Sequence, residues 1–118
     1  MRVHRGELVL VDFPFSDRTG SKVRPALVVQ SDVWNQTLDD TILALISSSR
    51  RRRVGAATQR FVEIASPEAT GTGLRIDSVV QCENLVTLDQ GLILTVLGRL
   101  GPQLMSEIDD CLRASLEV

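Results

Sequence analysis

The chain has 118 residues, of which 43% are hydrophobic and 24% charged, and its net charge is −2 at pH 7. These values are ordinary for a globular protein, and we expect one domain over residues 1–118. They argue against a nucleic-acid binder with a uniformly basic surface, so such a role requires locally concentrated positive charge. No apolar stretch approaches the ~20 residues of a membrane helix, and the N-terminus lacks a signal peptide's apolar region. We therefore expect a cytoplasmic protein that does not bind membranes.

Short apolar runs separated by polar turns predict a series of β-strands. We expect strands at 7–13, 25–30, 41–47 and 58–65, a single helical turn within 31–40, and further strands within 77–86 and 91–100. The last segment differs, because Pro102 suits a first helical position and apolar residues then recur at helical spacing. It predicts an amphipathic helix over 102–116.

The connections between the predicted strands are too short and polar to contain the crossover helices of a parallel sheet. The sequence therefore favours a mainly β fold: a small antiparallel barrel or strongly bent sheet, with the terminal helix packed against it. The two cysteines, Cys82 and Cys111, lie far apart in apolar patterns. They are too few for a zinc site, and we expect buried free thiols.

The stretch SKVRPALVVQ places Arg24 directly before a proline and an apolar run. Pro25 disfavours the helical region for the residue before it, so Arg24 is expected to be extended and firmly held. If strand 25–30 pairs antiparallel with strand 41–47 so that Gln30 faces Thr41, then Arg24 faces Ser47. Further serines and four arginines follow at 48–53. Guanidinium groups and hydroxyls in such a cluster are suited to binding a phosphate.

Four stretches of the chain resemble the MazF/PemK toxins of bacterial toxin–antitoxin pairs. They are RGELVLVDF, GSKVRPALVVQSD, TILALIS and GLRIDSVVQCENLVTLD. The resemblance implies an SH3-like barrel that forms a homodimer and cuts single-stranded RNA at short sequences without a metal or other cofactor. It also implies a small antitoxin protein that blocks the RNA groove.

On this resemblance the family's essential arginine is Arg24, and Ser47 stands where the family usually has threonine. We expect both to be catalytic, stabilising the charge that develops when the RNA 2′-hydroxyl attacks the adjacent phosphorus. RNA contacts are expected from Lys22, Ser48, Ser49, Arg50, Arg51, Arg52, Arg53 and Asp77. Some members also have a glutamate at the position of Thr19, so the sequence offers no acid there, and Asp17 cannot be placed. The general base stays unassigned, since nothing connects His4, the only histidine, to the site.

Two alternatives remain open. Relatives on the same barrel poison DNA gyrase through their C-terminal helix, but the ending CLRASLEV does not obviously resemble that group. The serine at position 47 and the missing loop acid also allow an RNA-binding module without catalytic activity.

Overall fold

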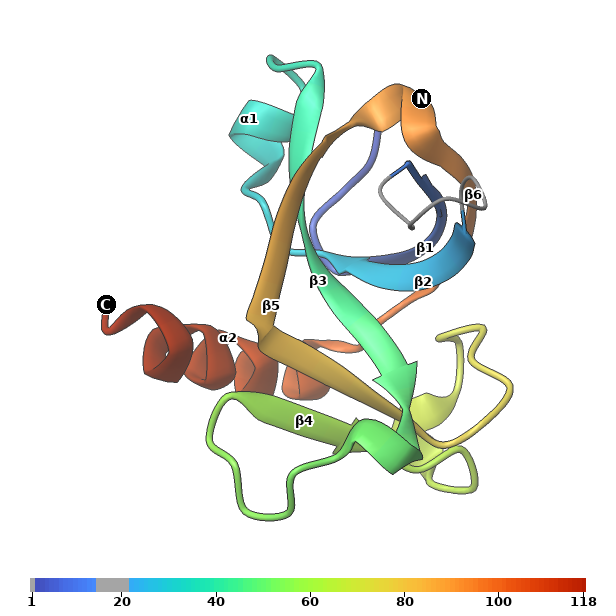
Figure 1. The fold of residues 1–118 in the computed structure, drawn as a ribbon, viewed down its shortest axis with the longest axis vertical. Coiled ribbons are helices and arrows are strands. Elements are labelled where there is room, and N and C mark those ends of the chain that lie inside the picture. The colour runs from blue at the N-terminus through green and yellow to red at the C-terminus, as the bar shows by residue number, and fades with distance from the viewer. Residues whose placement is uncertain (1, 15–21) are drawn as a thin grey trace.

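The structure is a computed structural model that describes residues 2–14 and 22–118, and Figure 1 shows its fold. The strands are β1 (Glu7–Phe13), β2 (Lys22–Val28), β3 (Asp40–Ser48), β4 (Gln59–Val62), β5 (Ser78–Asp89) and β6 (Ile93–Arg99). The helices are α1 (Asp32–Asn35) and α2 (Pro102–Leu116), and short 3₁₀ turns are η1 (Ser49–Arg51), η2 (Pro67–Ala69) and η3 (Gln90–Leu92). None of the helices in the described ranges is long and apolar enough to cross a membrane.

The six strands form one sheet in the order β4-β5-β3-β2-β1-β6, and every neighbouring pair is antiparallel. This confirms the prediction of an antiparallel, mainly β fold with a C-terminal helix. The sheet curls strongly, so that β1, β2 and β6 lie at one end of the molecule while β4 and α2 lie at the other (Figure 1). β2 and β3 are adjacent in the sheet and connect these two regions. Their register therefore decides which residues of the two strands come to lie at the same level.

A large β-bulge in β5 produces much of this curvature. Ala44 of β3 pairs with Leu85, whereas the next residue, Leu45, pairs with Gln81. The residues between these partners, 82–84, therefore have no opposite residue on β3. Bulges bend the strand that contains them and increase its twist, and Figure 1 shows β5 turning at this level. The bend redirects the N-terminal half of β5, including Gln81, along the lower part of β3.

Alternate residues of the strands enter two separate apolar clusters, one on each face of the sheet. In β1, Val9 and Val11 belong to the cluster enclosed by the curled sheet, while Leu8 belongs to the cluster beneath α2. β2 behaves in the same way, with Ala26 in the enclosed cluster and Leu27 beneath the helix. Position in the sequence therefore determines the face on which each strand residue lies.

The helix α2 covers the apolar cluster that contains Leu8 and Leu27, and it does so with a single apolar face. Leu104, Ile108 and Cys111 are its buried residues, and they pack with Cys82 of β5 and other strand residues. Full burial of an aliphatic side chain is worth about 1.5–3 kcal/mol, so Leu104 and Ile108 together contribute several kcal/mol to holding the helix on the sheet. Both cysteines are free and buried, as predicted.

Candidate active site

Arg24 lies inside β2 rather than just before it. The sequence predicted a strand from residue 25, but β2 begins at Lys22 because β1 continues as its partner, with Val11 opposite Arg24 and Phe13 opposite Lys22. The side chain of Arg24 is exposed, and its backbone is extended as Pro25 requires. β3 pairs with β2 only from Ala26 onward, so Pro25 lies where β2 has a single neighbour, a position that tolerates proline.

The β2–β3 register is the one that the sequence predicted. The paired residues are Ala26 with Leu45, Leu27 with Ala44 and Val28 with Leu43. Continued past the last pair, this register brings Arg24 and Ser47 to the same level. The ladder itself stops before them, which leaves the space between the two side chains open.

That space is a groove of about 630 Å³, which we call the Arg24 groove. Its lining residues come from β1, β2, β3, β5 and the segments beside them: Phe13, Lys22, Arg24, Pro25, Leu45, Ile46, Ser47, Ser48, Arg50, Arg51, Ile76, Gln81 and Asn84. Six of the ten predicted site residues are thus brought together. Asp17, and Thr19 at the position where some members of the family have glutamate, lie outside the described residues.

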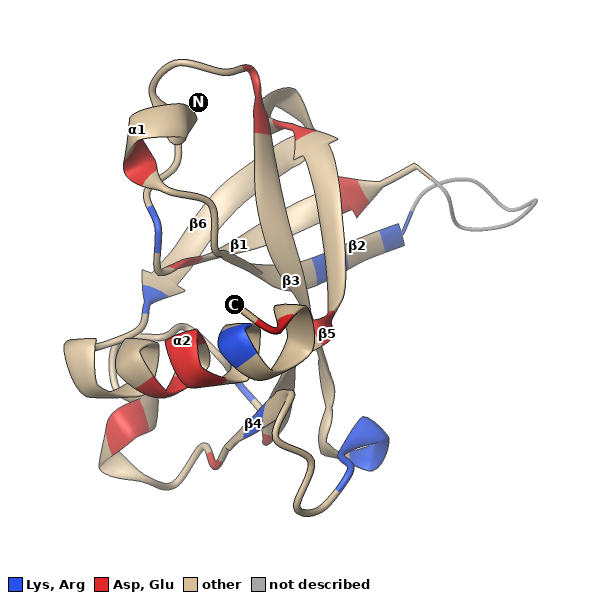
Figure 2. Cartoon of the chain, turned by 90° about the vertical axis from the view of Figure 1, so that its left-hand side faces the viewer, with Lys and Arg blue, Asp and Glu red and all other residues tan. Residues whose placement is uncertain are grey.

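Among the described residues, the lining of the Arg24 groove contains four basic side chains and no aspartate or glutamate. None of the four cations forms an ion pair with any described residue. Figure 2 shows that the basic residues of β2 and of η1 lie on the same side of the molecule, while acidic residues gather on α2. A chain with net charge −2 therefore concentrates positive charge in this groove, which attracts an anion to it.

Gln81 is the main residue of the groove that the sequence reasoning missed. The Ser47 hydroxyl donates a hydrogen bond of 3.0 Å to Gln81 Oε1. Gln81 is opposite Leu45, and Ser47 is two residues further along β3, so both side chains emerge on the same face. One sequence signal was available, because Gln81 is a polar residue that directly follows two apolar residues, Val79 and Val80.

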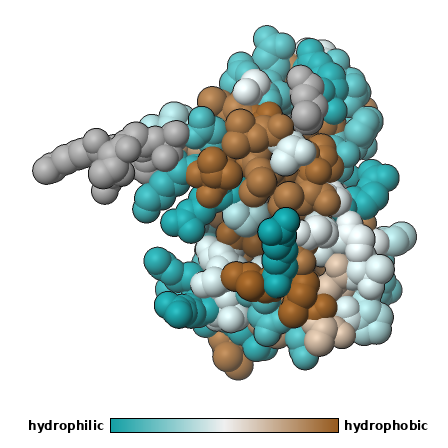
Figure 3. All heavy atoms as spheres, turned by 90° about the vertical axis from the view of Figure 1, so that its right-hand side faces the viewer, coloured by the Kyte–Doolittle hydropathy of each residue, from teal (hydrophilic) through white to brown (hydrophobic). Residues whose placement is uncertain are grey.

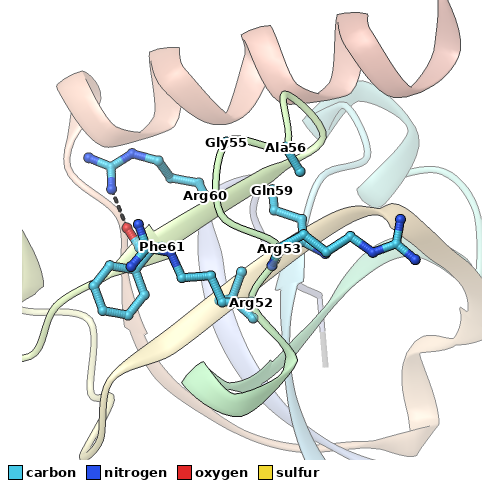
Figure 4. A pocket seen from close by; sticks show the side chains of 8 residues that line it. Arg52, Arg53, Gly55, Ala56, Gln59, Arg60 and Phe61 are labelled. Carbon is cyan, nitrogen blue, oxygen red and sulfur yellow. Dashed lines mark hydrogen bonds between the residues drawn. The ribbon is translucent and has the colours of Figure 1, made fainter.

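The arginine run is divided between two sites. Arg50 and Arg51 line the Arg24 groove, whereas Arg52 and Arg53 line a second pocket of about 340 Å³ beside β4 (Figure 4). The division follows from η1, a turn that ends at Arg51 and sends the chain across to β4. In the second pocket the Arg52 guanidinium lies 4.1 Å from the centre of the Phe61 ring.

Ser49 and Asp77, both predicted to contact RNA, line neither pocket. Their polar groups are used within the protein: the Ser49 N–H donates to the Asp77 carbonyl, and Asp77 Oδ1 accepts from the Ile64 N–H at 2.8 Å. These contacts connect η1 with the segments flanking β4 and β5, so both residues shape the walls of the site.

Neither a histidine nor a metal-binding cluster contributes to the groove among the described residues. His4 lies near α1, with Nδ1 3.9 Å from Asp32 Oδ1, and does not line the groove. Among residues 2–14 and 22–118, no cluster of three or more His, Cys, Asp or Glu side chains could hold a metal ion. The arrangement is one of an exposed guanidinium on a strand, a hydrogen-bonded hydroxyl and additional cations around an open space, which can bind a phosphodiester and stabilise charge on its oxygens.

Comparison with known protein families matches residues 4–116 to the PemK-like, MazF-like toxins of type II toxin–antitoxin systems. The chain belongs to this family.

Relatives within the PemK/MazF family are similar along the whole chain. Endoribonuclease EndoA of Bacillus subtilis is 30% identical over 98% of this chain and 96% of its own. Endoribonuclease MazF6 of Mycobacterium tuberculosis is 32% identical over the full length of both proteins. The match supports the resemblance read from the sequence motifs.

Solved structures of the PemK/MazF family confirm the fold. A mycobacterial endoribonuclease, solved with its cognate antitoxin, superposes with a TM-score of 0.75 at 20% identity, covering 98% of this chain and 96% of that one. MazF in a MazE–MazF complex from Deinococcus radiodurans gives a TM-score of 0.72 at 19% identity, covering 100% and 99%. The small β-barrel with a C-terminal helix is thus the fold of this chain.

Proposed function

We propose that this chain is the toxin of a type II toxin–antitoxin system and that it cleaves single-stranded RNA at specific short sequences. The observation that supports this most directly is the Arg24 groove, where an exposed guanidinium, the Ser47 hydroxyl and three further cations surround one open space. Two relatives of at least 30% identity are named endoribonucleases. Messenger RNA in the cytoplasm is the expected target.

The reaction uses a nucleophile that the substrate itself provides. The 2′-oxygen of one ribose attacks the adjacent phosphorus in line, the bond to the 5′-oxygen breaks, and the products end in a 2′,3′-cyclic phosphate and a 5′-hydroxyl. The 2′-hydroxyl gives up its proton and the departing 5′-oxygen gains one. Negative charge accumulates on the non-bridging oxygens, where Arg24 donates hydrogen bonds and Ser47 donates its single hydroxyl proton after that proton turns away from Gln81 Oε1. A well-placed donor of this kind is worth about 3–4 kcal/mol in the transition state.

The same groove is the proposed binding site for the antitoxin. Its basic lining suits an acidic segment of a small partner protein, and a disordered segment could fold along it. A mycobacterial relative of the same fold has been solved with its cognate antitoxin. Such a segment would compete with RNA for the same cations and would thereby inhibit cleavage without a second binding site.

We further propose that the toxin is a homodimer. Figure 3 shows apolar side chains gathered on one side of the molecule, the side on which β6 lies in Figure 1. Leu94 and Val96 of β6 are 53% and 37% exposed. Exposed apolar surface of this kind marks interaction sites. Size-exclusion chromatography with light scattering would give twice the chain mass if a second copy covers this surface, and the chain mass if it does not.

The central experiment is cleavage of a long single-stranded RNA with mapping of the new ends, in buffer containing EDTA. The wild type is expected to cut at a short recurring sequence, and a 2′-deoxy nucleotide at the cut site should abolish cleavage. Arg24→Ala should lower the cleavage rate roughly 100- to 1,000-fold. Arg113→Ala, on the exposed face of α2, is the matched arginine control and should cleave normally.

Other outcomes of the same assay assign other functions. An Arg24→Ala variant that folds and cuts like the wild type would remove Arg24 from the mechanism. RNA binding without cleavage by the wild type would indicate an inactive RNA-binding module. A plasmid supercoiling assay run in parallel would detect a gyrase poison instead.

A further inference from the structure

The second pocket lies on the same face of the sheet as Ser47. Ser47 is opposite Val79 of β5, and Val79 is opposite Phe61 of β4. Residues directly opposite each other in antiparallel ladders project from the same face. Two strand spacings separate Ser47 from Phe61, which is roughly 10 Å between their backbones. A chain held at Ser47 can therefore place a neighbouring group on Phe61.

Phe61 has a flat apolar ring, and arginine side chains line the pocket around it. The ring is half-buried, and its visible partner is the Arg52 guanidinium at 4.1 Å. Arg60 also lines the pocket, but it is bound to Glu68 at 2.7 Å and Glu107 at 3.4 Å on the side facing α2. Figure 4 shows the Arg52 side chain running toward the Phe61 ring, whereas the Arg53 side chain points away from it.

The loop that closes this pocket is already fixed. Gln59 Oε1 accepts a hydrogen bond from the Arg53 N–H at 2.8 Å, and Gln59 Nε2 donates to Glu83 Oε2 at 2.7 Å. Neither Arg52 nor Arg53 has an acidic partner within ion-pair distance among the described residues. The loop around the pocket is thus preformed and its positive charge is unneutralised, and the volume of about 340 Å³ beside the Arg52 side chain suits one small planar ring.

We propose that the second pocket is a stacking subsite for one unpaired base of the RNA whose scissile phosphate lies in the Arg24 groove. This inference rests on the proposed function and adds to it a residue, Phe61, and a neighbouring base. The base takes the place of the Arg52 guanidinium on the Phe61 ring, and Arg52 turns to the adjoining phosphate. An arginine–ring contact is thereby exchanged for base stacking plus a charge-assisted hydrogen bond. Only a single strand supplies such a base, since a duplex keeps its bases stacked inside.

The test combines removal of the ring with removal of the base. The probes are single-stranded RNA oligonucleotides centred on a mapped cleavage site, each with one abasic position, scanned along both sides of the scissile phosphate. For the wild type, one position is expected to raise KM about 5- to 100-fold when its base is absent. For Phe61→Leu, KM should be raised on intact RNA by a similar factor, and removing that base should have no further effect.

The kinetic constants separate this subsite from the reaction centre. Stacking stabilises the bound RNA and the transition state equally, so kcat should change little while KM rises. Phe61→Trp keeps an aromatic surface and should retain the wild-type abasic profile. Val54→Ala, in the same loop and 83% exposed, is the matched control outside the pocket. If Phe61→Leu does not fold by circular dichroism, Phe61→Ile, whose β-branched side chain suits a strand, takes its place.

The outcomes distinguish the subsite from the proposed function. If the wild type cleaves RNA but Phe61→Leu gives the same abasic profile as the wild type, the subsite is wrong and the nuclease stands. If the wild type binds RNA without cutting it, the scan is repeated with Kd from fluorescence anisotropy on a mixed-sequence single-stranded RNA. A ring-dependent position would then support the subsite while the nuclease fails. A protein that neither binds nor cuts RNA overturns both.

Discussion

The Ser47 hydroxyl and the Gln81 side chain are joined by a hydrogen bond of 3.0 Å across the β3–β5 pair. Asn84 Nδ2 also approaches Gln81 Oε1, at 3.5 Å. This hydrogen bond restricts the rotation of the serine side chain, which a threonine at the same position would need less. Threonine has a restricted χ1 because of its methyl group, whereas serine rotates more freely. Gln81 Oε1 accepts the Ser47 hydroxyl proton in the free protein, and when that proton turns to the phosphate the Gln81 amide can rotate so that Nε2 donates to Ser47 Oγ. Gln81 thus supplies by hydrogen bonding the restraint that a methyl group would supply by steric contact.

Replacing Gln81 by leucine should therefore reduce cleavage by releasing the Ser47 hydroxyl. A hydrogen bond of this type contributes about 0.5–1.5 kcal/mol, so kcat is expected to fall roughly 2- to 12-fold with little change in KM. Steady-state cleavage of a defined RNA oligonucleotide measures both constants. The rescue is Ser47→Thr in the Gln81→Leu background, which should restore most of kcat by restricting χ1. A double variant no faster than Gln81→Leu alone would show that Gln81 does not act through Ser47.

Removing the positive charge of η1 should weaken RNA binding without altering the chemical step. Arg50 and Arg51 line the Arg24 groove and have no ion-pair partner among the described residues. For single strands, each phosphate contact contributes about 0.7 to the slope of log affinity against log salt concentration. Arg50→Ala with Arg51→Ala should lower that slope by up to roughly 1.4, measured by anisotropy between 50 and 300 mM salt on single-stranded RNA. An unchanged slope would mean that these cations do not contact phosphates.

Much of the fold was predictable because the relevant patterns are local. Alternation of apolar residues marked the strands, and the turn after strand 25–30 set the register that brings Arg24 and Ser47 together. The site was less predictable where it depends on pairing between distant segments. The β5 bulge decides where Gln81 points, and it arises only when β3 and β5 are aligned. The arginine run is likewise divided because η1 ends at Arg51. Four identical residues in succession do not indicate at which of them a turn ends.

Asp77 is expected to contribute to stability rather than to RNA affinity. Its carboxylate accepts the Ile64 N–H at 2.8 Å, close to the start of β5. Hydrogen bonds to charged groups are worth about 1.5–3 kcal/mol, so Asp77→Ala should lower the free energy of unfolding by an amount in this range. Urea denaturation followed by circular dichroism gives the change. Loss of RNA binding by a variant as stable as the wild type would instead return Asp77 to the RNA interface.

Alkaline pH should destabilise the protein through its buried thiols. Burial, with a smaller contribution from the neighbouring Cys111, raises the pKa of Cys82 to about 12 from 9.0. Burial likewise raises the pKa of Cys111. A thiol whose pKa is higher in the folded state adds stability that is fully present below its unfolded pKa and is lost as pH rises toward the folded value.

The free energy of unfolding is therefore expected to fall between about pH 9 and 12, by at most ~1.4 kcal/mol per pH unit for each thiol. The chain has no tyrosine and one lysine, Lys22, so few other side chains titrate in this window. Urea denaturation at pH 8.0, 9.5 and 10.5 measures the slope, and Cys82→Ala should reduce it although it lowers stability at every pH. A wild-type slope that Cys82→Ala leaves unchanged would assign the alkaline loss to other groups. The same burial predicts that neither thiol reacts with a disulfide reagent at pH 8 until the protein unfolds.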